Sequence, residues 1–182
     1  MYTSNSAADP ENVLSRIKRG LAGYVSYLAA CEMNEAFSEY VLYEPMLRIL
    51  TARGFTVECE VPCPGLAKAP DGDYKKLDFK VQRNGLHFAI EAKWARQSRL
   101  NVTRDLEKLD AFRRVVSGSR SFLCVFGQKS RIRNLRLSSS AFAELGDPII
   151  AEFGVTRYGC RVFELVGESK QTAVTVDSDR SS

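Results

Sequence analysis

The stretch KLDFKVQRNGLHFAIEAKW, residues 76–94, decides the fold because a two-residue turn lies at its centre. Asn84 and Gly85 accept the positive φ angles that such a turn requires. Both flanks are rich in Phe, Val, Leu and Ile, which favour strands. The sequence therefore predicts a β-hairpin with a tight turn.

The turn also predicts the register of the hairpin. If Arg83 faces Leu86, Asp78 lies opposite Glu91, and Lys93 projects to the same side as Glu91 because side chains alternate along a strand. We expect one polar side and one side that packs on a core. The other members of the polar side are Lys80, Gln82, His87 and Ala89, and the core side consists of Leu77, Phe79, Val81, Phe88, Ile90, Ala92 and Trp94.

Two opposed carboxylates need compensation, because like charges on facing strand positions are destabilising. A hard divalent cation that prefers oxygen ligands, Mg²⁺ above all, would supply it, with Lys93 near a metal-bound water. Two alternatives stay open. Asp78, Glu91 and Lys93 could form an ordinary solvated strand face, or a β-bulge could shift the register and separate the carboxylates.

The motifs Leu-Asp-Phe-Lys at 77–80 and Ala-Ile-Glu-Ala-Lys-Trp at 89–94 resemble those of the PD-(D/E)XK nuclease superfamily, although Leu77 replaces the family's Pro. The resemblance covers about residues 39–128. It implies a Mg²⁺-dependent nuclease, most simply a DNA endonuclease, in which Mn²⁺ can substitute. It assigns the metal to Asp78, Glu91 and the backbone carbonyl of Ala92, and the orientation of the attacking water to Lys93.

A helix is expected before the hairpin, followed by Gly54 as a C-cap. Pro45 must either kink this helix or begin it again as part of a first turn. The resemblance places one helix carboxylate at the metal site, for which Glu39 is the first choice and Glu44 the reserve. A plain solvated helix residue is the alternative for both.

The whole chain, 1–182, is interpreted as one α/β domain with a mixed sheet of four to five strands flanked by helices. The resemblance implies an αβββαβ restriction-endonuclease-like core over about 35–130 and an extra N-terminal helix. We expect helices at 10–30, 35–53, 101–116 and 140–145, strands at 56–61, 121–127, 161–166 and 172–176, a loop at 62–73, and a disordered tail at 177–182.

Positive charge is concentrated after the hairpin. The formal net charge is only +4, but the segment from Lys93 to Arg136 holds twelve Lys and Arg against three Asp and Glu. Such a region suits a phosphate backbone, whereas the alternative is a solvated face with internal ion pairs. The candidate nucleic-acid contacts are Lys76, Arg96, Arg104, Lys108, Gln128, Lys129, Arg131 and Arg133.

The remaining composition limits the class of protein. No apolar run is long enough to span a bilayer, and the five cysteines are scattered, so we expect a soluble, cytoplasmic protein with reduced thiols. The expected partner is nucleic acid, DNA in particular, and no association with a membrane is expected. A homodimer would provide one site for each DNA strand, but no interface residues identify themselves. The second hypothesis is a catalytically inactive nuclease fold that binds nucleic acid or a protein partner.

Overall fold

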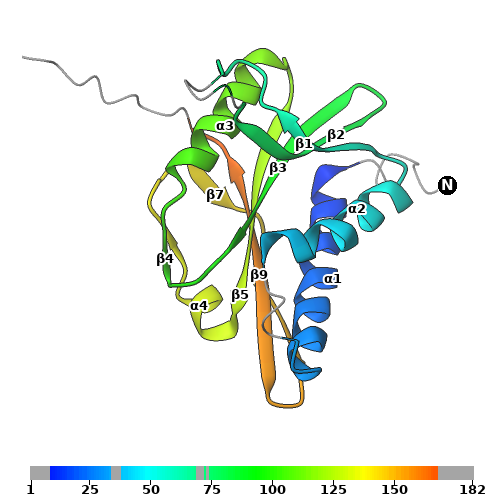
Figure 1. The fold of residues 1–182 in the computed structure, drawn as a ribbon, viewed down its shortest axis with the longest axis vertical. Coiled ribbons are helices and arrows are strands. Elements are labelled where there is room, and N and C mark those ends of the chain that lie inside the picture. Colours follow the sequence, from blue (N-terminus) through cyan, green and yellow to red (C-terminus); the bar gives the residue numbers. More distant parts are fainter. Residues whose placement is uncertain (1–8, 34–37, 69–71, 73, 168–182) are drawn as a thin grey trace, which may run out of the picture.

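The structure, a computed structural model, describes residues 9–33, 38–68, 72 and 74–167. In this part of the chain, a seven-stranded mixed sheet stands between two layers of helices. The helices α1 (Pro10–Ala30) and α2 (Tyr43–Ala52) cover one face, and α3 (Thr103–Val115) covers the other (Figure 1). None of the helices described is both long and apolar enough to cross a membrane.

The order of the main sheet is β1-β2-β3-β5-β9-β7, and β8 also pairs with β9. Only the β3–β5 pair is parallel, and α3 makes the crossover between these two strands. The strands are β1 (Thr56–Pro62), β2 (Lys76–Arg83), β3 (Leu86–Trp94), β5 (Arg120–Gln128), β7 (Phe142–Glu144), β8 (Ile149–Phe153) and β9 (Thr156–Leu165). A separate parallel ribbon joins β4 (Arg99–Leu100) to β6 (Arg136–Leu137), and α4 (Lys129–Arg133) follows β5.

The hairpin and its register are confirmed. Asn84 and Gly85 have φ angles of 49° and 80°, and Arg83 faces Leu86. The predicted N-terminal helix is also confirmed, since the Asp9 side chain accepts a hydrogen bond from the Glu11 amide at 3.0 Å. These local signals were sufficient because each element carries its own turn or cap.

Pro45 lies in the first turn of α2, which begins at Tyr43 after the short 3₁₀ helix η2 (Glu39–Leu42). A first-turn amide has no partner within its own helix, so proline is accommodated there. The helix therefore begins again rather than kinking. Its predicted start at Glu35 lies outside the described residues.

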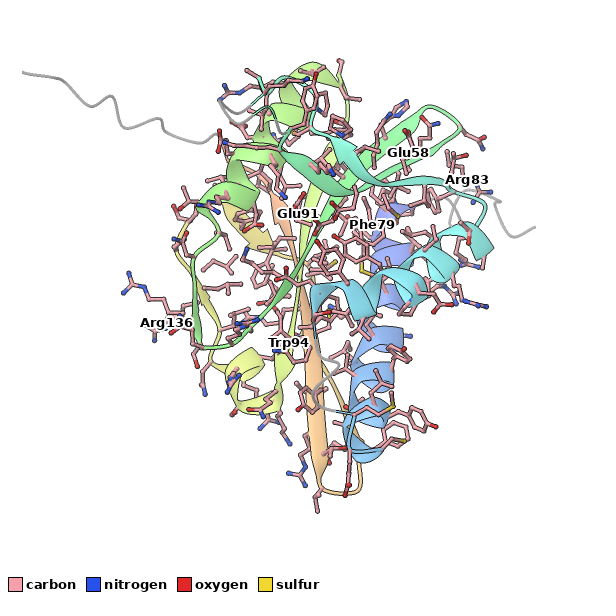
Figure 2. All side chains as sticks on the ribbon, viewed as in Figure 1. Glu58, Phe79, Arg83, Glu91, Trp94 and Arg136 are labelled. Carbon is pink, nitrogen blue, oxygen red and sulfur yellow. The ribbon has the colours of Figure 1, made fainter. Side chains whose placement is uncertain are left out.

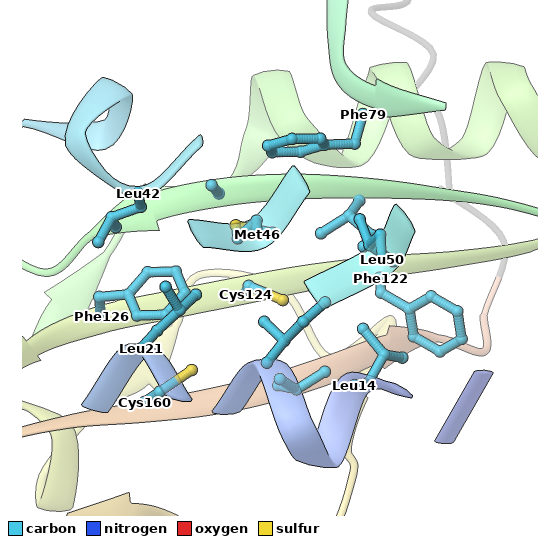
Figure 3. Close-up of a cluster of buried hydrophobic side chains, with 14 of the residues drawn as sticks. Leu14, Leu21, Leu42, Met46, Leu50, Phe79, Phe122, Cys124, Phe126 and Cys160 are labelled. Atoms are coloured by element: carbon cyan, nitrogen blue, oxygen red, sulfur yellow. The ribbon is translucent and has the colours of Figure 1, made fainter. Parts of the chain in front are cut away.

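Both faces of the hairpin contribute to a core, but the polar side is only partly covered, since Ala89 and Glu91 are buried whereas Lys80, Gln82 and His87 are partly exposed. A first core packs α1 and α2 on residues such as Phe79, Phe122 and Phe126 (Figure 3). A second core packs α3 on the other face and includes Ala89 and Leu77. The prediction for Leu77 was wrong, since Leu77 packs in the second core whereas Phe79 packs in the first.

The later part of the chain differs most from the prediction. The helix expected at 140–145 is wrong, since Phe142–Glu144 form β7 and pair with the end of β9. The sheet has seven strands rather than four to five, because β7 and β8 extend its β9 edge. The expected strand at 172–176 and the tail at 177–182 lie outside the described residues. All five cysteines are unbonded thiols.

Candidate functional site

The ladder of paired residues between β2 and β3 ends at Phe79 and Ile90, and beyond this split Asp78 and Glu91 are not paired through their backbones. The two carboxylates then make the cross-strand contacts themselves. The Ala92 amide donates to Asp78 Oδ2 at 2.7 Å, and the Asp78 amide donates to Glu91 Oε1 at 3.2 Å. The predicted meeting of Asp78 and Glu91 is therefore made through side chains, each of which binds the backbone of the facing strand.

Both carboxylates sit in surroundings that disfavour their charge. Glu91 is only 1% exposed and Asp78 is half-buried. Burial raises the pKa of Glu91 to about 8, and the neighbouring Asp78 adds to this rise. Burial also raises the pKa of Asp78, against the hydrogen bond from Ala92. This pair of carboxylates would gain strongly from a cation.

Helix α3 brings a lysine to the pair. The Lys108 ammonium forms an ion pair with Glu91 Oε2 and donates to the Lys76 carbonyl oxygen at 2.9 Å. Burial lowers the pKa of Lys108, but the negative charge and hydrogen bond of Glu91 outweigh burial and raise it overall. Lys108, one of the candidate nucleic-acid contacts, is therefore a direct neighbour of the carboxylates. Figure 2 shows Glu91 at the centre of the molecule on β3.

A second ion pair joins α3 to β3. Lys93 Nζ lies 2.7 Å from Asp105 Oδ2, with 25% and 8% of the two side chains exposed. Lys93 lies on the same side of β3 as Glu91, so the structure brings the three predicted hairpin residues together. It also adds Asp105 and Lys108 to them.

Two further residues lie at the site, Tyr43 on α2 and Glu60 on β1. The Tyr43 hydroxyl donates to Glu60 Oε1 at 2.8 Å and also lowers the pKa of Asp78 by hydrogen bonding. Glu60 has φ of 53°, a left-handed conformation that is rare for a residue other than glycine, and it interrupts the β1–β2 ladder across from Asp78. Strained backbone of this kind is concentrated at functional sites.

The two helix carboxylates are placed differently. Glu39 accepts a hydrogen bond from the Trp94 amide at 3.0 Å through Oε1, so it lies at the end of β3, directly after Lys93. Glu44 pairs with Arg48 on the exposed surface of α2. Of the two candidates, the structure therefore brings Glu39 and not Glu44 to β3.

The oxygen donors fit a hard divalent cation in their chemistry. Asp78 and Glu91 supply two carboxylates, and the Ala92 carbonyl faces the same side as the Ala92 amide that binds Asp78. Mg²⁺ is commonly held by one or two carboxylates together with water and substrate phosphates. No group of three or more His, Cys, Asp or Glu side chains suited to a metal occurs in the described part of the chain. Glu39 therefore does not complete a three-carboxylate cluster.

The predicted nucleic-acid residues divide into two groups. Three of them have partners within the protein. Lys108 pairs with Glu91, Lys129 pairs with Glu152 at 2.9 Å, and Arg131 donates to the Ala95 carbonyl oxygen at 3.5 Å. The rest, namely Lys76, Arg96, Arg104, Gln128 and Arg133, are exposed.

Two grooves lie near Trp94, the last residue of β3. One, of about 480 Å³, is lined by Glu39, Tyr40, Trp94, Arg96 and Arg99, among others. The other, of about 780 Å³, is lined by Gln128, Lys129, Arg133, Arg157 and Tyr158, among others. The Trp94 and Tyr158 rings, 5.9 Å apart between centroids, connect the two surfaces. Four of the predicted nucleic-acid contacts thus line grooves near the end of β3.

Sequence reasoning missed Asp105, Glu60 and the role of Lys108 at the carboxylates. A signal existed for the two α3 residues, because Asp105, Lys108 and Leu109 follow helical spacing and share the face that is buried. Charged residues on an apolar stripe indicate a polar partner on the opposing element. For Glu60 there was no signal, since nothing in TVECEVP marks a left-handed residue.

Comparisons with protein-family models, with curated proteins and with solved structures found no match to this chain.

Proposed function

We propose that this protein is a metal-dependent nuclease that hydrolyses phosphodiester bonds, with DNA as its substrate and Mg²⁺ or Mn²⁺ as its cofactor. The observation that carries the proposal is the buried pair of Asp78 and Glu91 at the split between β2 and β3, with Lys93 on the same side. Adjacent carboxylates whose pKa values are raised by burial are concentrated at functional sites.

Each residue has a definite task in this proposal. Asp78, Glu91 and the Ala92 carbonyl would hold the cation, which when bound supplies Lewis-acid activation of the phosphodiester and of water. Lys93 would orient the attacking water or neutralise charge on the phosphate as it is attacked. Asp105 keeps the Lys93 ammonium next to β3 until substrate arrives.

The order of elements supports a restriction-endonuclease-like core. A helix, three antiparallel strands, a crossover helix and a strand parallel to the third follow one another from α2 to β5. This order is the αβββαβ arrangement that the sequence motifs imply, with α1 as the extra N-terminal helix. The support is topological, and the proposed chemistry depends on the side chains at the split.

A binding module without catalysis is the second candidate, and one observation favours it. Lys108 already pairs with Glu91 and Asp105 with Lys93, so two of the three predicted hairpin residues are neutralised within the protein. In this alternative, the same fold would bind nucleic acid through its arginines, or bind a protein partner, without cleaving anything.

Cleavage assays with purified protein separate the two candidates. Plasmid, linear duplex, branched and single-stranded DNA, together with RNA, are incubated with Mg²⁺, with Mn²⁺ and with a chelator. We expect metal-dependent cleavage of DNA that falls at least about 100-fold in Asp78→Asn, Glu91→Gln and Lys93→Ala. Binding of DNA in the presence of chelator should persist in all three variants.

A matched pair of variants on the preceding helix provides the control. Glu39→Gln should slow cleavage, because Glu39 holds the end of β3 through the Trp94 amide. Glu44→Gln should cleave like the wild type, because Glu44 lies on the exposed surface with Arg48. Absence of metal-dependent cleavage on all substrates, with DNA binding retained, would favour the binding module instead.

A further inference from the structure

The short ribbon of β4 and β6 aligns two arginines side by side. The Cα partners are Arg99 with Arg136 and Leu100 with Leu137. Leu100 is buried in the second core and Leu137 packs against it, so the arginines project to the opposite, outer side of the ribbon. Both arginines are exposed, and Figure 2 shows Arg136 at the outer margin of the molecule.

Hydrogen bonds around the ribbon fix this alignment. The Arg136 amide donates to the Ser98 carbonyl oxygen at 2.7 Å, and the Ser138 amide donates to the Leu100 carbonyl oxygen at 2.9 Å. Ser138 Oγ then accepts from the Val102 amide at 3.1 Å. The two guanidinium groups therefore extend from a backbone that is held at both ends.

Neither arginine side chain has a hydrogen bond or ion pair with a described residue. Arg120 and Arg161, by contrast, are each paired with a glutamate at 2.7 Å through Nε. Like charges at facing positions of a ribbon are destabilising. A bound anion would relieve that repulsion at Arg99 and Arg136.

We propose that Arg99 and Arg136 together bind one phosphate group of a nucleic-acid strand. A planar guanidinium group can donate two parallel hydrogen bonds to the oxygens of one phosphate. A pair of arginines therefore suits a phosphate better than an anion that offers a single contact. The proposal rests on the proposed function for the nature of the ligand, since an unpaired arginine pair by itself specifies only an anion.

The adjoining groove links this pair to the candidate catalytic residues. Arg99 lines the groove of about 480 Å³ together with Arg96, Trp94 and Glu39, and Trp94 directly follows Lys93. Tyr40, 70% exposed, presents an aromatic ring in the same groove. A strand whose phosphate lies at the ribbon can thus pass by Arg96 and a stacking ring towards the end of β3.

Fluorescence anisotropy with labelled DNA, in chelator so that nothing is cleaved, tests the proposal. Single-stranded and duplex oligonucleotides are titrated with the wild type, Arg99→Gln, Arg136→Gln and the double variant. We expect each single substitution to weaken binding about tenfold. The plot of log K against log salt should become less steep, by about 0.7 for single strands or about 0.9 for duplex, because one phosphate contact is lost. The change in the double variant should differ from the sum of the two, because the arginines share one phosphate.

Arg19→Gln is the matched control, since Arg19 is an exposed arginine on α1 and its loss changes the net charge equally. It should bind DNA like the wild type. Binding by the ribbon variants that equals the Arg19→Gln result on both substrates would overturn the proposal. A loss on one substrate only supports it and identifies the strand form that the ribbon takes.

Arg99→Lys distinguishes a phosphate fork from simple charge. It should recover less than half of the affinity lost in Arg99→Gln, whereas full recovery would contradict a bidentate contact. Failure of this inference and of the proposed function can be told apart. If the wild type cleaves DNA and the ribbon variants bind DNA as it does, only the proposal for the ribbon is wrong. If DNA binding depends on the two arginines and no substrate is cleaved, only the nuclease proposal is wrong.

Discussion

Between β3 and α3, the charged side chains of the candidate site are paired, whereas along β4 and β6 the two arginines have no partner among the described residues. Lys108 pairs with Glu91 and Lys93 pairs with Asp105, all largely shielded from water. Arg99 and Arg136 are exposed and aligned. The difference separates two tasks. Paired, buried charges stabilise the protein and must exchange partners to act, while exposed, unpaired charges can bind an anion at no such cost.

Removal of Lys108 should have the largest effect on stability. At pH about 9, where most Glu91 is ionised, Lys108→Met leaves a buried carboxylate without its cation, and we expect a loss of about 3–5 kcal/mol of unfolding free energy. Chemical denaturation in the presence of chelator measures it. At pH about 5 the loss should be much smaller, because Glu91 is then protonated.

Lys80→Met is the control for this comparison. Lys80 pairs with Glu58 at 2.8 Å on the partly exposed side of β1 and β2, and such pairs contribute about 1 kcal/mol or less. An equal loss of stability in Lys80→Met and Lys108→Met would remove the distinction between the buried pair and surface pairs.

The pH dependence of stability follows from the pKa of Glu91, raised from an ordinary value of 4.5 to about 8. Between these values the folded state binds a proton that the unfolded state has lost. The free energy of unfolding therefore falls as pH rises through this window, by a few kcal/mol in all, and Asp78 acts in the same direction.

Glu91→Gln tests this linkage because glutamine cannot ionise. In chelator, the variant should show a flatter dependence of unfolding free energy on pH than the wild type over the same window. Parallel curves for the two proteins would show that Glu91 does not titrate with a raised pKa.

The Lys93–Asp105 pair should matter less for stability, because a quarter of the Lys93 side chain is exposed. We expect Asp105→Asn to cost about 1–2 kcal/mol, because the loss of one partner of a partly buried ion pair costs more than at the surface and less than in a fully buried pair. A double-mutant cycle with Lys93→Gln should give a coupling energy of at least about 0.5 kcal/mol. Strictly additive losses would mean that the two side chains do not interact in solution.

The parts of the site that lie on the hairpin could be predicted because a turn sets their register. Asn84 and Gly85 specify the turn, and the alternation of side chains then brings Asp78, Glu91 and Lys93 together. The buried run at 121–127 likewise indicated the strand that became parallel to β3. Local rules were enough wherever one short segment contains its own signal.

The remaining parts depend on contacts that are distant in the sequence. Lys108 reaches Glu91 only because α3 packs on β3, and Phe142–Glu144 form a strand only because β9 offers an edge. The β1–β2 ladder is interrupted where Glu60, with φ of 53°, lies across from Asp78. Pairing across such separations decides secondary structure and side-chain partners against local preference.

The smallest expected effect on stability is at the ribbon of β4 and β6. Arg136→Gln should leave the free energy of unfolding within about 0.5 kcal/mol of the wild type, or raise it slightly, since it removes repulsion with Arg99 and breaks no ion pair. Arg161→Gln is the contrast. Arg161 is 14% exposed, pairs with Glu144 and donates to the Leu135 carbonyl oxygen at 3.0 Å, so its loss should cost about 1–3 kcal/mol.

Thermal and chemical unfolding of these two arginine variants, without nucleic acid, measures the difference. A large destabilisation by Arg136→Gln would mean that this arginine holds the fold, and the ribbon would then belong with the paired region around Glu91. Unchanged stability together with weaker DNA binding would place Arg136 among residues whose charge acts on a ligand. The combination is informative because a structural arginine cannot give it: a side chain that contributes nothing to folding can weaken binding only through the bound state.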